Sequence, residues 1–277
     1  MKKVNYNESM LSVVICTYNE ENNLPRVVKS VKDLADEIVV VDTESTDNTV
    51  AVAKKLGCKV FHHKNTRIIE PVRNFASSKT SGDWILLLDA DEEVNQELAT
   101  EIKQILKKPS ADVYKINRQN IIFGKWIKSD HWWPDPVFRL YKKGSLVWQD
   151  EIHSLPQISG SQSILKNPLI HHNYQTISQY LKKLDVYTDI QAKELIDRDN
   201  SFDWTNLVKK PFAEFLSQLF ARNGLKDGHH GLVLAGLQAF SELVVQIKVW
   251  ELSHFPINDL SLTDFQSQIL PLQKELK

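Results

Sequence analysis

Residues 84–94 read WILLLDADEEV, a continuous apolar run that ends in four carboxylates within five residues. Such a run needs apolar cover on both faces, which is typical of a strand inside a parallel sheet. Two earlier runs have the same character, LSVVICT at residues 11–17 and EIVVVD at residues 37–42. Longer helical patterns separate the runs, so the sequence predicts an α/β fold with a largely parallel, doubly wound sheet.

The helical patterns carry start and stop signals. Pro25 lies in a first turn, Gly57 and Gly82 follow two expected helix ends, and Pro109 follows a third. Helices are expected at residues 23–34, 47–56, 70–81 and 95–107. Strands are expected at residues 11–17, 37–42, 59–62, 84–89 and 112–117.

The later part of the chain has a different character. Residues 118–160 are rich in aromatic and turn-forming residues and contain four of the seven tryptophans. After His171 and His172 the pattern is helical, and the glycine-containing segment 224–231 marks a loop before a long apolar helix. We therefore expect an α/β domain over residues 1–160 and a helical extension over residues 161–277.

The apolar helix expected at residues 232–250 approaches the length of a membrane span. Polar residues interrupt it, which argues against spanning. Gln238, Glu242 and Gln246 recur every fourth residue and form one narrow polar stripe. The rest of its surface is apolar, so we expect most of the helix to be buried in a core, an oligomer interface or a bilayer surface.

Charge and cysteine usage exclude several classes of protein. The 34 Lys and Arg residues balance 35 Asp and Glu residues, giving a net charge of −1, which argues against binding nucleic acid through bulk charge. Cys16 and Cys58 lie in apolar stretches without a partner at metal-ligand spacing, so no disulfide or zinc site is expected. The apolar run near the N-terminus is too short for a signal peptide, and we expect a cytoplasmic protein.

Polar clusters follow three of the expected strands: residues 17–20 (TYNE), 42–47 (DTESTD) and 89–93 (DADEE). Ligands of open α/β sheets bind beyond the carboxyl ends of the strands, so the clusters should lie side by side. An isolated Asp-x-Asp is often a solvated turn, but the apolar run before it and the two other clusters favour a ligand site. Asp89 and Asp91 offer hard oxygen ligands that suit Mg²⁺ or Mn²⁺ on the phosphates of a nucleotide diphosphate.

The glycines exclude the usual nucleotide cradles. None of the nine forms GxGxxG or GxxxxGK[ST]. A nucleotide would therefore be held by side chains such as those of Thr17, Asp42 and Asp47. Asp47 has an equally good structural role as the N-cap of the helix expected at residues 47–56, and the two roles are compatible.

A family resemblance connects these motifs. VVICTYNEENN, DEIVVVDTESTDNT and EPVRNFASSKTSGDWILLLDADEEV resemble the nucleotide-sugar transferase domain of family two glycosyltransferases, which have the GT-A fold. The later pattern WWPDPVFRLYKKG and the helical segments are similar to the bacterial branch that adds sugars to the lipopolysaccharide inner core. The resemblance implies inverting transfer of a sugar, with UDP-hexose as the expected donor, to a glycan or lipid-linked acceptor.

The resemblance, together with the strand-end clusters, assigns roles to individual residues. Asp42 is expected at the base or ribose, Arg73 at the diphosphate, and Asp91 as the main metal ligand with Asp89 and His153 beside it. The expected nucleotide-sugar site comprises Thr17, Tyr18, Asn19, Glu20, Asp42, Ser45, Asp47, Arg73, Asn74, Asp89 and Ala90.

Inverting transfer also needs a carboxylate general base. The similar branch has His-Glu where this chain has His153-Ser154. The candidates are Asp150 or Glu151, just before His153, and Asp135 of the WPDP motif. Asp150 and Glu151 are equally compatible with a polar turn, and the sequence also allows that none of the three is the base.

The acceptor side is expected to be aromatic and basic. Trp132, Trp133 and Trp148 can stack on sugar rings, although tryptophans also fill cores, and Arg139 can bind an anionic acceptor. Lysines and arginines of the helical extension suit peripheral contact with an anionic inner membrane, and a homo-oligomer interface explains the same helices equally well.

Two other functions compete with the transferase. A haloacid-dehalogenase-type phosphatase also uses DxD after an apolar strand, but there the motif follows the first strand, whereas here it follows the fourth. A sugar-nucleotide-binding protein that has lost catalysis is the second alternative, because Ser154 occupies the position of the usual glutamate.

Overall fold

The computed structural model describes residues 9–66, 69–149, 155–198 and 202–255. The chain divides into two compact units, Met1–Gln175 and Thr176–Lys277. The boundary lies beyond the expected residue 160, because strands β11 and β12, at Gln162–Ile164 and Leu169–His171, pair with β6 of the first unit.

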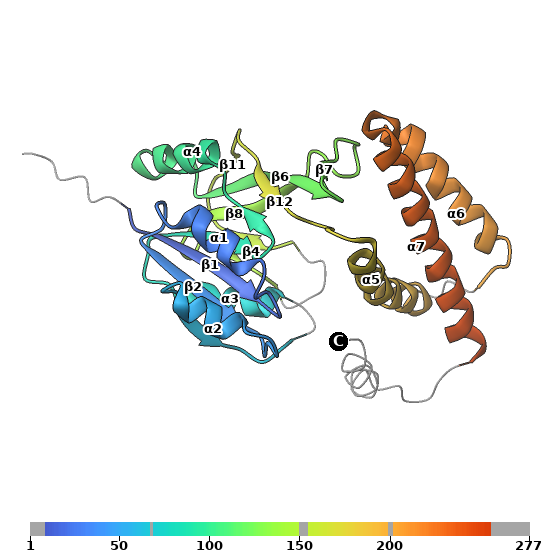
Figure 1. The fold of residues 1–277 in the computed structure, drawn as a ribbon, viewed down its shortest axis with the longest axis horizontal. Helices are drawn as coiled ribbons and strands as arrows, with labels where there is room; N and C mark the ends of the chain where they lie inside the picture. Colours follow the sequence, from blue (N-terminus) through green and yellow to red (C-terminus); the bar gives the residue numbers. More distant parts are fainter. Residues whose placement is uncertain (1–8, 67–68, 150–154, 199–201, 256–277) are drawn as a thin grey trace, which may run out of the picture. The chain divides into compact units, whose positions relative to one another are not determined.

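The first unit alternates strands and helices over its first half and is then mainly strands (Figure 1). Its first half comprises β1 Leu11–Thr17, α1 Leu24–Val31, β2 Glu37–Asp42, α2 Thr49–Lys55, β3 Lys59–His62, α3 Glu70–Ser78, β4 Trp84–Asp89, β5 Glu92–Glu93 and α4 Gln96–Lys107. The strands that follow, before β11 and β12, are β6 Val113–Ile122, β7 Lys125–Trp126, β8 Pro136–Lys142, β9 Leu146–Val147 and β10 Gln157–Ile158.

The main sheet has the order β3-β2-β1-β4-β8-β6-β12-β5. Its first four strands are parallel, as expected for connections through helices. β8 is antiparallel to both β4 and β6, and β5 is antiparallel to β12, so the second half of the sheet is mixed. The expectation of a largely parallel sheet therefore holds for β1 to β4 only.

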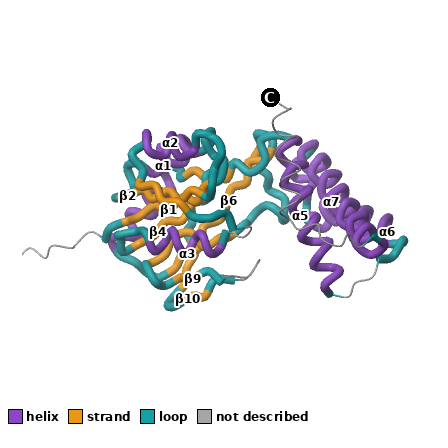
Figure 2. Tube along the Cα trace, turned by 90° about the horizontal axis from the view of Figure 1, so that it is seen from below, coloured by secondary structure: helices purple, strands orange, loops and turns teal. Residues whose placement is uncertain are grey.

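Three of the parallel strands, β1, β2 and β4, are buried because both of their faces are covered. Val13 and Ile15 of β1 join a core with residues of α1, α2 and α4, whereas Val14 and Cys16 join a second core with residues of α3. Figure 2 shows α1 and α2 on one side of these strands and α3 on the other. The four parallel strands β1, β2, β3 and β4 begin and end where the sequence predicts.

The differences from the expected elements lie at helix ends and in the later strands. The helix expected at residues 70–81 ends at Ser78, because Ser77 and Thr80 form a hydrogen-bonded turn after it. The strand expected at residues 112–117 extends to Ile122, because β7, β8, β11 and β12 all pair with it. None of the expected strands lies between residues 118 and 160, where the structure has β7 to β10.

The second unit is helical. It comprises α5 Ile177–Asp197, α6 Asn206–Leu216, a π-helical turn at Ser217–Ala221, a 3-10 helix (η2) at Gly224–Asp227 and α7 His229–His254. The expected loop at residues 224–231 is therefore shorter, because η2 and the first turn of α7 occupy most of it. Gly231 permits this: a Cβ there would lie 1.8 Å from the carbonyl oxygen of Gly224.

Helix α7 is only partly buried. Gln246 of the polar stripe is buried and donates a 2.9 Å hydrogen bond to Glu242, whereas Val233, Phe240 and Ile247 are exposed. By length and composition alone, α7 is apolar enough to cross a membrane, and it is the one such helix among the described residues. Of the three environments expected for this helix, a protein core covers Leu234, Ala235, Val245 and Val249. An oligomer interface or a bilayer surface stays a prediction for the exposed residues.

Candidate active site

The register of the parallel strands brings the three polar clusters to one edge. Thr17 is paired with Asp42 of β2, and Cys16 is paired with Asp89 of β4. Thr17 and Asp42 are buried, while Asp89 is partly exposed at the end of its strand. The expected juxtaposition of the first two clusters with the Asp-x-Asp motif is confirmed.

The first two clusters interlock by hydrogen bonds. Asn19, which adopts a positive φ of 56°, accepts a 2.8 Å hydrogen bond from the Thr46 N–H and donates its own N–H to Ser45 Oγ. Asp42 Oδ2 accepts from the Ser45 N–H at 3.1 Å. Asp42 Oδ1 is buried and has no hydrogen-bond partner among the described residues. A buried acceptor of this kind is suited to a ligand N–H or hydroxyl.

Asp47 is not the N-cap of α2, which is Asn48, but its side chain still bonds the start of that helix. Its Oδ1 accepts from the N–H of Thr49, the first residue of α2, and its Oδ2 accepts from the Glu21 N–H. Burial opposes ionisation of Asp47, but these hydrogen bonds outweigh it and hold its pKa below the usual range. Thr49 Oγ1 accepts from the Glu20 N–H, and Tyr18 of the first cluster is half exposed.

Asp89 lies between two arginines. Its Oδ1 is 3.1 Å from Arg73 Nη2 and its Oδ2 contacts Arg139 Nη2. Burial opposes ionisation, but Arg139 and Arg73 outweigh it and hold the pKa of Asp89 well below its usual range. Ala90, the next residue, is buried in the core, and its packing there holds the end of the strand in place.

Glu92 is a residue of this site that sequence reasoning did not single out. It is completely buried, and its Oε2 accepts the Asp89 N–H at 2.9 Å while its Oε1 accepts from Arg139 Nη2 at 2.7 Å. Burial raises the pKa of Glu92. Arg139 was expected to face an anionic acceptor. It is instead buried beneath Asp89, at the end of β4, and Glu92, on β5, because these two carboxylates need a cation between them.

Arg73 and Asn74 of α3 are fixed by the segment after β9. The Arg73 guanidinium lies 4.6 Å from the centre of the Trp148 ring, and Asn74 forms two hydrogen bonds with the Trp148 backbone. Arg73 Nε is buried and lacks a partner among the described residues. Trp148 therefore packs against the expected diphosphate side of the site.

Asp91 faces a histidine from a distant part of the chain. Its Oδ2 is 3.5 Å from Nε2 of His171, and next to it His172 Nε2 is 2.8 Å from Glu93. β12 pairs with β5 in the register His171 with Glu92, which creates these contacts. The sequence treated the two histidines only as a boundary, and the one available signal was their place at the end of a short apolar run.

Asp135 of the WPDP motif belongs to the same network. Its Oδ2 accepts from Arg118 Nε at 2.8 Å and from Asn120 Nδ2 at 3.0 Å. Burial opposes ionisation, but Arg118 and these hydrogen bonds outweigh it and lower the pKa of Asp135. Asn120 Oδ1 in turn lies 2.7 Å from His171 Nδ1, so hydrogen bonds connect Asp135 to the histidine that faces Asp91.

Comparison with known proteins identifies the family. A model described as "Glycosyl transferase family 2" matches residues 12–185. The chain belongs to glycosyl transferase family 2. It is therefore a glycosyltransferase, and its four parallel strands, mixed second half and helical C-terminal unit form a Rossmann-like, GT-A fold.

The relatives of this glycosyltransferase include enzymes matched along most of their length. The uncharacterized glycosyltransferase RT0209 of Rickettsia typhi is 32% identical over 262 residues, which cover 88% of this chain and 87% of the relative. The lipopolysaccharide core biosynthesis glycosyltransferase LpsC of Rhizobium meliloti is 24% identical, over 87% of this chain and 92% of LpsC. The crystal structure of S. aureus TarS 1–349 is 15% identical with a TM-score of 0.47, over 87% of this chain and 90% of TarS.

Several residues that the sequence predicts for the site are not among the contacts described above. Asp150, Glu151, His153 and Ser154 lie outside the described residues. Trp132 and Trp133 are partly exposed; the ring of Trp132 packs edge-on against Tyr174, and that of Trp133 packs edge-on against Trp126. Their acceptor role stays a prediction.

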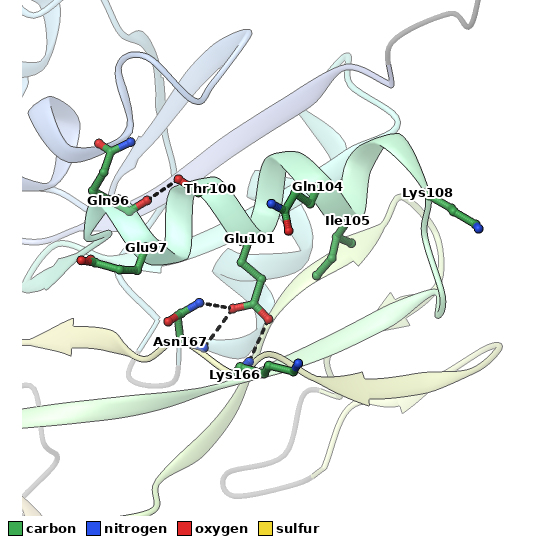
Figure 3. Close-up of a pocket in the computed structure, with 9 residues that line it drawn as sticks. All are labelled: Gln96, Glu97, Thr100, Glu101, Gln104, Ile105, Lys108, Lys166 and Asn167. Atoms are coloured by element: carbon green, nitrogen blue, oxygen red, sulfur yellow. Dashed lines mark hydrogen bonds between the residues drawn. The ribbon is translucent and has the colours of Figure 1, made fainter.

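A surface pocket along α4 is separate from the strand-end site. Figure 3 shows Glu101 of α4 accepting hydrogen bonds from the backbone N–H groups of Lys166 and Asn167 and from the Asn167 side chain. None of the residues drawn belongs to the three strand-end clusters. These contacts attach α4 to the segment before β12.

Proposed function

We propose that this glycosyltransferase transfers a sugar, with inversion, from a nucleotide-diphosphate sugar to a hydroxyl of a glycan or glycolipid acceptor. The observation that carries the proposal is the pair Asp91 Oδ2 and His171 Nε2, 3.5 Å apart at the edge where the parallel strands end. UDP-hexose is the donor that we propose, and lipopolysaccharide core is the type of acceptor, in keeping with the similarity to LpsC.

The residues fit a divalent cation. A carboxylate oxygen and an imidazole nitrogen are both ligands of Mn²⁺, and Asp91 with His171 supplies them; Mg²⁺ suits the oxygen ligands. Within the described part of the chain, no group of three or more His, Cys, Asp or Glu side chains is placed to hold a metal, so the donor's diphosphate would complete the coordination. The bound cation would offset the charge of the leaving diphosphate.

The donor would lie along the same edge. Asp42 Oδ1, buried and without a partner among the described residues, is suited to accept a hydrogen bond from the base or ribose. Arg73 provides positive charge at the diphosphate. Asp89 is fully engaged by Arg73 and Arg139, and we propose that it mainly orients these groups, with the ribose nearby.

Asp135 is our proposed general base among the described residues. It is ionised at neutral pH because Arg118 lowers its pKa, and its Oδ1 accepts no hydrogen bond from another described residue. Asp150 and Glu151 are the alternatives. Asp135→Asn, Asp150→Asn and Glu151→Gln compared in one transfer assay identify the base as the variant that retains donor binding and loses turnover.

The helical unit is proposed to contact an anionic membrane surface that presents a lipid-linked acceptor. Trp204, Val208, Phe212 and Phe220 are exposed along α6 and its ends, with Lys209 beside them. Aromatic and basic residues on one helix face are typical of helices at a bilayer surface. A homo-oligomer interface is the other outcome of the vesicle-binding test described in the Discussion.

The central experiment is release of UDP from UDP-hexoses with Mn²⁺, with and without lipopolysaccharide-core acceptors. Asp91→Asn should lower turnover by at least about 100-fold, since loss of a metal ligand exceeds the effect of changes around the metal. Asp33→Asn, an exposed carboxylate of the same unit, is the control and should be unchanged. Undiminished turnover in Asp91→Asn contradicts the proposal. Donor binding without turnover on any acceptor indicates a sugar-nucleotide-binding protein.

A further inference from the structure

Asn120, on β6, joins the two halves of the proposed site and has no assigned role. Its side chain is completely buried. Nδ2 donates to the backbone oxygen of Trp132 at 3.0 Å and to Asp135 Oδ2 at 3.0 Å. Oδ1 lies 2.7 Å from His171 Nδ1 and accepts from Asn173 Nδ2 at 3.2 Å. Both hydrogens of the amide and both lone pairs of its oxygen are therefore engaged.

These partners determine which way the amide points. The Trp132 carbonyl and the ionised Asp135 carboxylate can only accept, so the NH₂ group of Asn120 must face them. The Asn173 amide approaches from the opposite side as a donor, which requires an oxygen there. Asn120 Oδ1 consequently faces His171, and this oxygen can only accept.

The orientation of Asn120 determines the tautomer of His171. Because Asn120 Oδ1 is an acceptor, the proton of the neutral imidazole must be on Nδ1. Nε2 then presents its lone pair toward Asp91 Oδ2, 3.5 Å away. Two electron-pair donors face each other with no proton between them, an arrangement that a cation stabilises. A partner on the remote nitrogen of a ligating histidine commonly fixes its tautomer in this way.

We propose that Asn120 is a positioning residue that holds His171 as the Nδ1–H tautomer for a divalent cation and, through the same amide, fixes the Asp135 carboxylate. This inference rests on the proposed metal-assisted transfer. Asn120 would contact neither cation nor sugar. Its buried amide connects the metal side of the site to the proposed base by hydrogen bonds. Asp91 on the metal side and Asp135, the proposed base, are 44 positions apart in the sequence.

The tautomer is measurable without changing Asn120. In protein labelled with ¹⁵N-histidine, metal-free and at a pH where imidazoles are neutral, His171 should show a protonated Nδ1 and an unprotonated Nε2. His171→Gln assigns the signal by its disappearance. A protonated Nε2 in the wild-type protein overturns the proposal, whatever the outcome of the transfer assay.

Two substitutions separate positioning from simple packing. Asn120→Leu removes the acceptor and should shift His171 toward the Nε2–H tautomer and weaken Mn²⁺ binding, measured with UDP present by electron paramagnetic resonance, by about 10–100-fold. Asn120→Asp keeps an acceptor for His171 and should restore the tautomer and most of the Mn²⁺ affinity, while turnover stays low because its carboxylate repels Asp135. Gln119→Leu, a neighbour on β6, is the control.

The outcomes distinguish this inference from the proposed function. Wild-type tautomer and Mn²⁺ affinity in folded Asn120→Leu overturn the positioning role and leave metal-assisted transfer intact. If the wild-type protein does not bind Mn²⁺ when UDP is present, the proposed metal-assisted transfer is contradicted. The Nδ1–H tautomer of His171 would then have no cation to bind. If Asn120→Leu does not fold, the wild-type tautomer and Asn120→Asp decide.

Discussion

The two units of this glycosyltransferase distribute charged and apolar residues in opposite ways. In the α/β unit, Arg139, Glu92 and Asp42 are buried at the carboxyl edge of a sheet whose apolar residues are almost all inside. In the helical unit, Val208 is 71% and Phe212 63% exposed, while Gln246 is buried. The first unit uses its apolar residues to hold a charged site. The second leaves many of its own outside.

The difference indicates different tasks. Burying ions is unfavourable unless each has a partner, and a protein that keeps such a cluster at a strand edge uses it to fix side chains in one geometry. A large exposed apolar patch is also unfavourable in water, and it marks a surface that binds a protein, a membrane or a ligand. We therefore expect substitutions in the first unit to affect stability and chemistry, and surface substitutions in the second to affect association.

Loss of the buried cation should have the largest effect. Arg139→Met leaves Glu92 and Asp89 without their shared guanidinium, and the free energy of unfolding should fall by about 3–5 kcal/mol. Urea unfolding measures it. Glu92→Gln keeps a hydrogen-bonding group at the Asp89 N–H and should cost less. Equal losses for the two variants would show that charge pairing is not what holds this cluster.

Association with vesicles tests the apolar face of α6. Two phenylalanine side chains each contribute about 1.5–3 kcal/mol when removed from water. Phe212→Ser with Phe220→Ser should therefore lower partition onto phosphatidylglycerol vesicles at least tenfold. Ile164→Ser, an exposed apolar residue of the first unit, is the control. If the double variant instead changes the mass measured by sedimentation without vesicles, and binds vesicles as the wild-type protein does, the apolar face is an oligomer interface.

Two glycines of α7 provide a matched pair. Gly231→Ala places a Cβ against the Gly224 carbonyl oxygen, and we expect a loss of about 1–3 kcal/mol with faster hydrogen exchange in η2. Gly236→Ala meets no atom within 4 Å and should stabilise the helix by about 0.5–1 kcal/mol. Equal effects would mean that η2 does not pack tightly on α7.

Acid should weaken the first unit through Glu37. Burial opposes ionisation of Glu37, but Lys59 and Ser12 outweigh it and lower its pKa from 4.5 to about 2. A lowered pKa in the folded state contributes stability above pH 4.5, which is lost as the pH falls from 4.5 toward 2. Glu37→Gln should remove this pH dependence. It should also lower the free energy of unfolding at neutral pH by only about 1 kcal/mol, because Lys59 is largely exposed and water screens the ion pair. Glu97→Gln is the control for urea unfolding across this range, and an identical pH dependence in Glu37→Gln contradicts the assignment.

Much of the site could be predicted from local sequence. Thr17, Asp42 and Asp89 follow apolar strands, and parallel strands place their carboxyl ends together, so their juxtaposition follows from order alone. His171 and Asn120 could not be predicted in this way, because β12 and β6 meet through a mixed sheet that has no local signal. Arg139 was misplaced for a related reason: a basic residue in an aromatic segment indicates a surface, and only the fold shows the two carboxylates above it.

The sequence by itself determined the four parallel strands, the family and the edge at which the chemistry lies, because parallel strands and the residues after them are local patterns. Tertiary structure decided which side chains meet. It placed His171 against Asp91, Asn120 between His171 and Asp135, and Arg139 beneath Asp89, and it buried Gln246 of α7. The physical reason is that the partner of a buried polar group is selected by strand register and packing, over separations in sequence that no local pattern records.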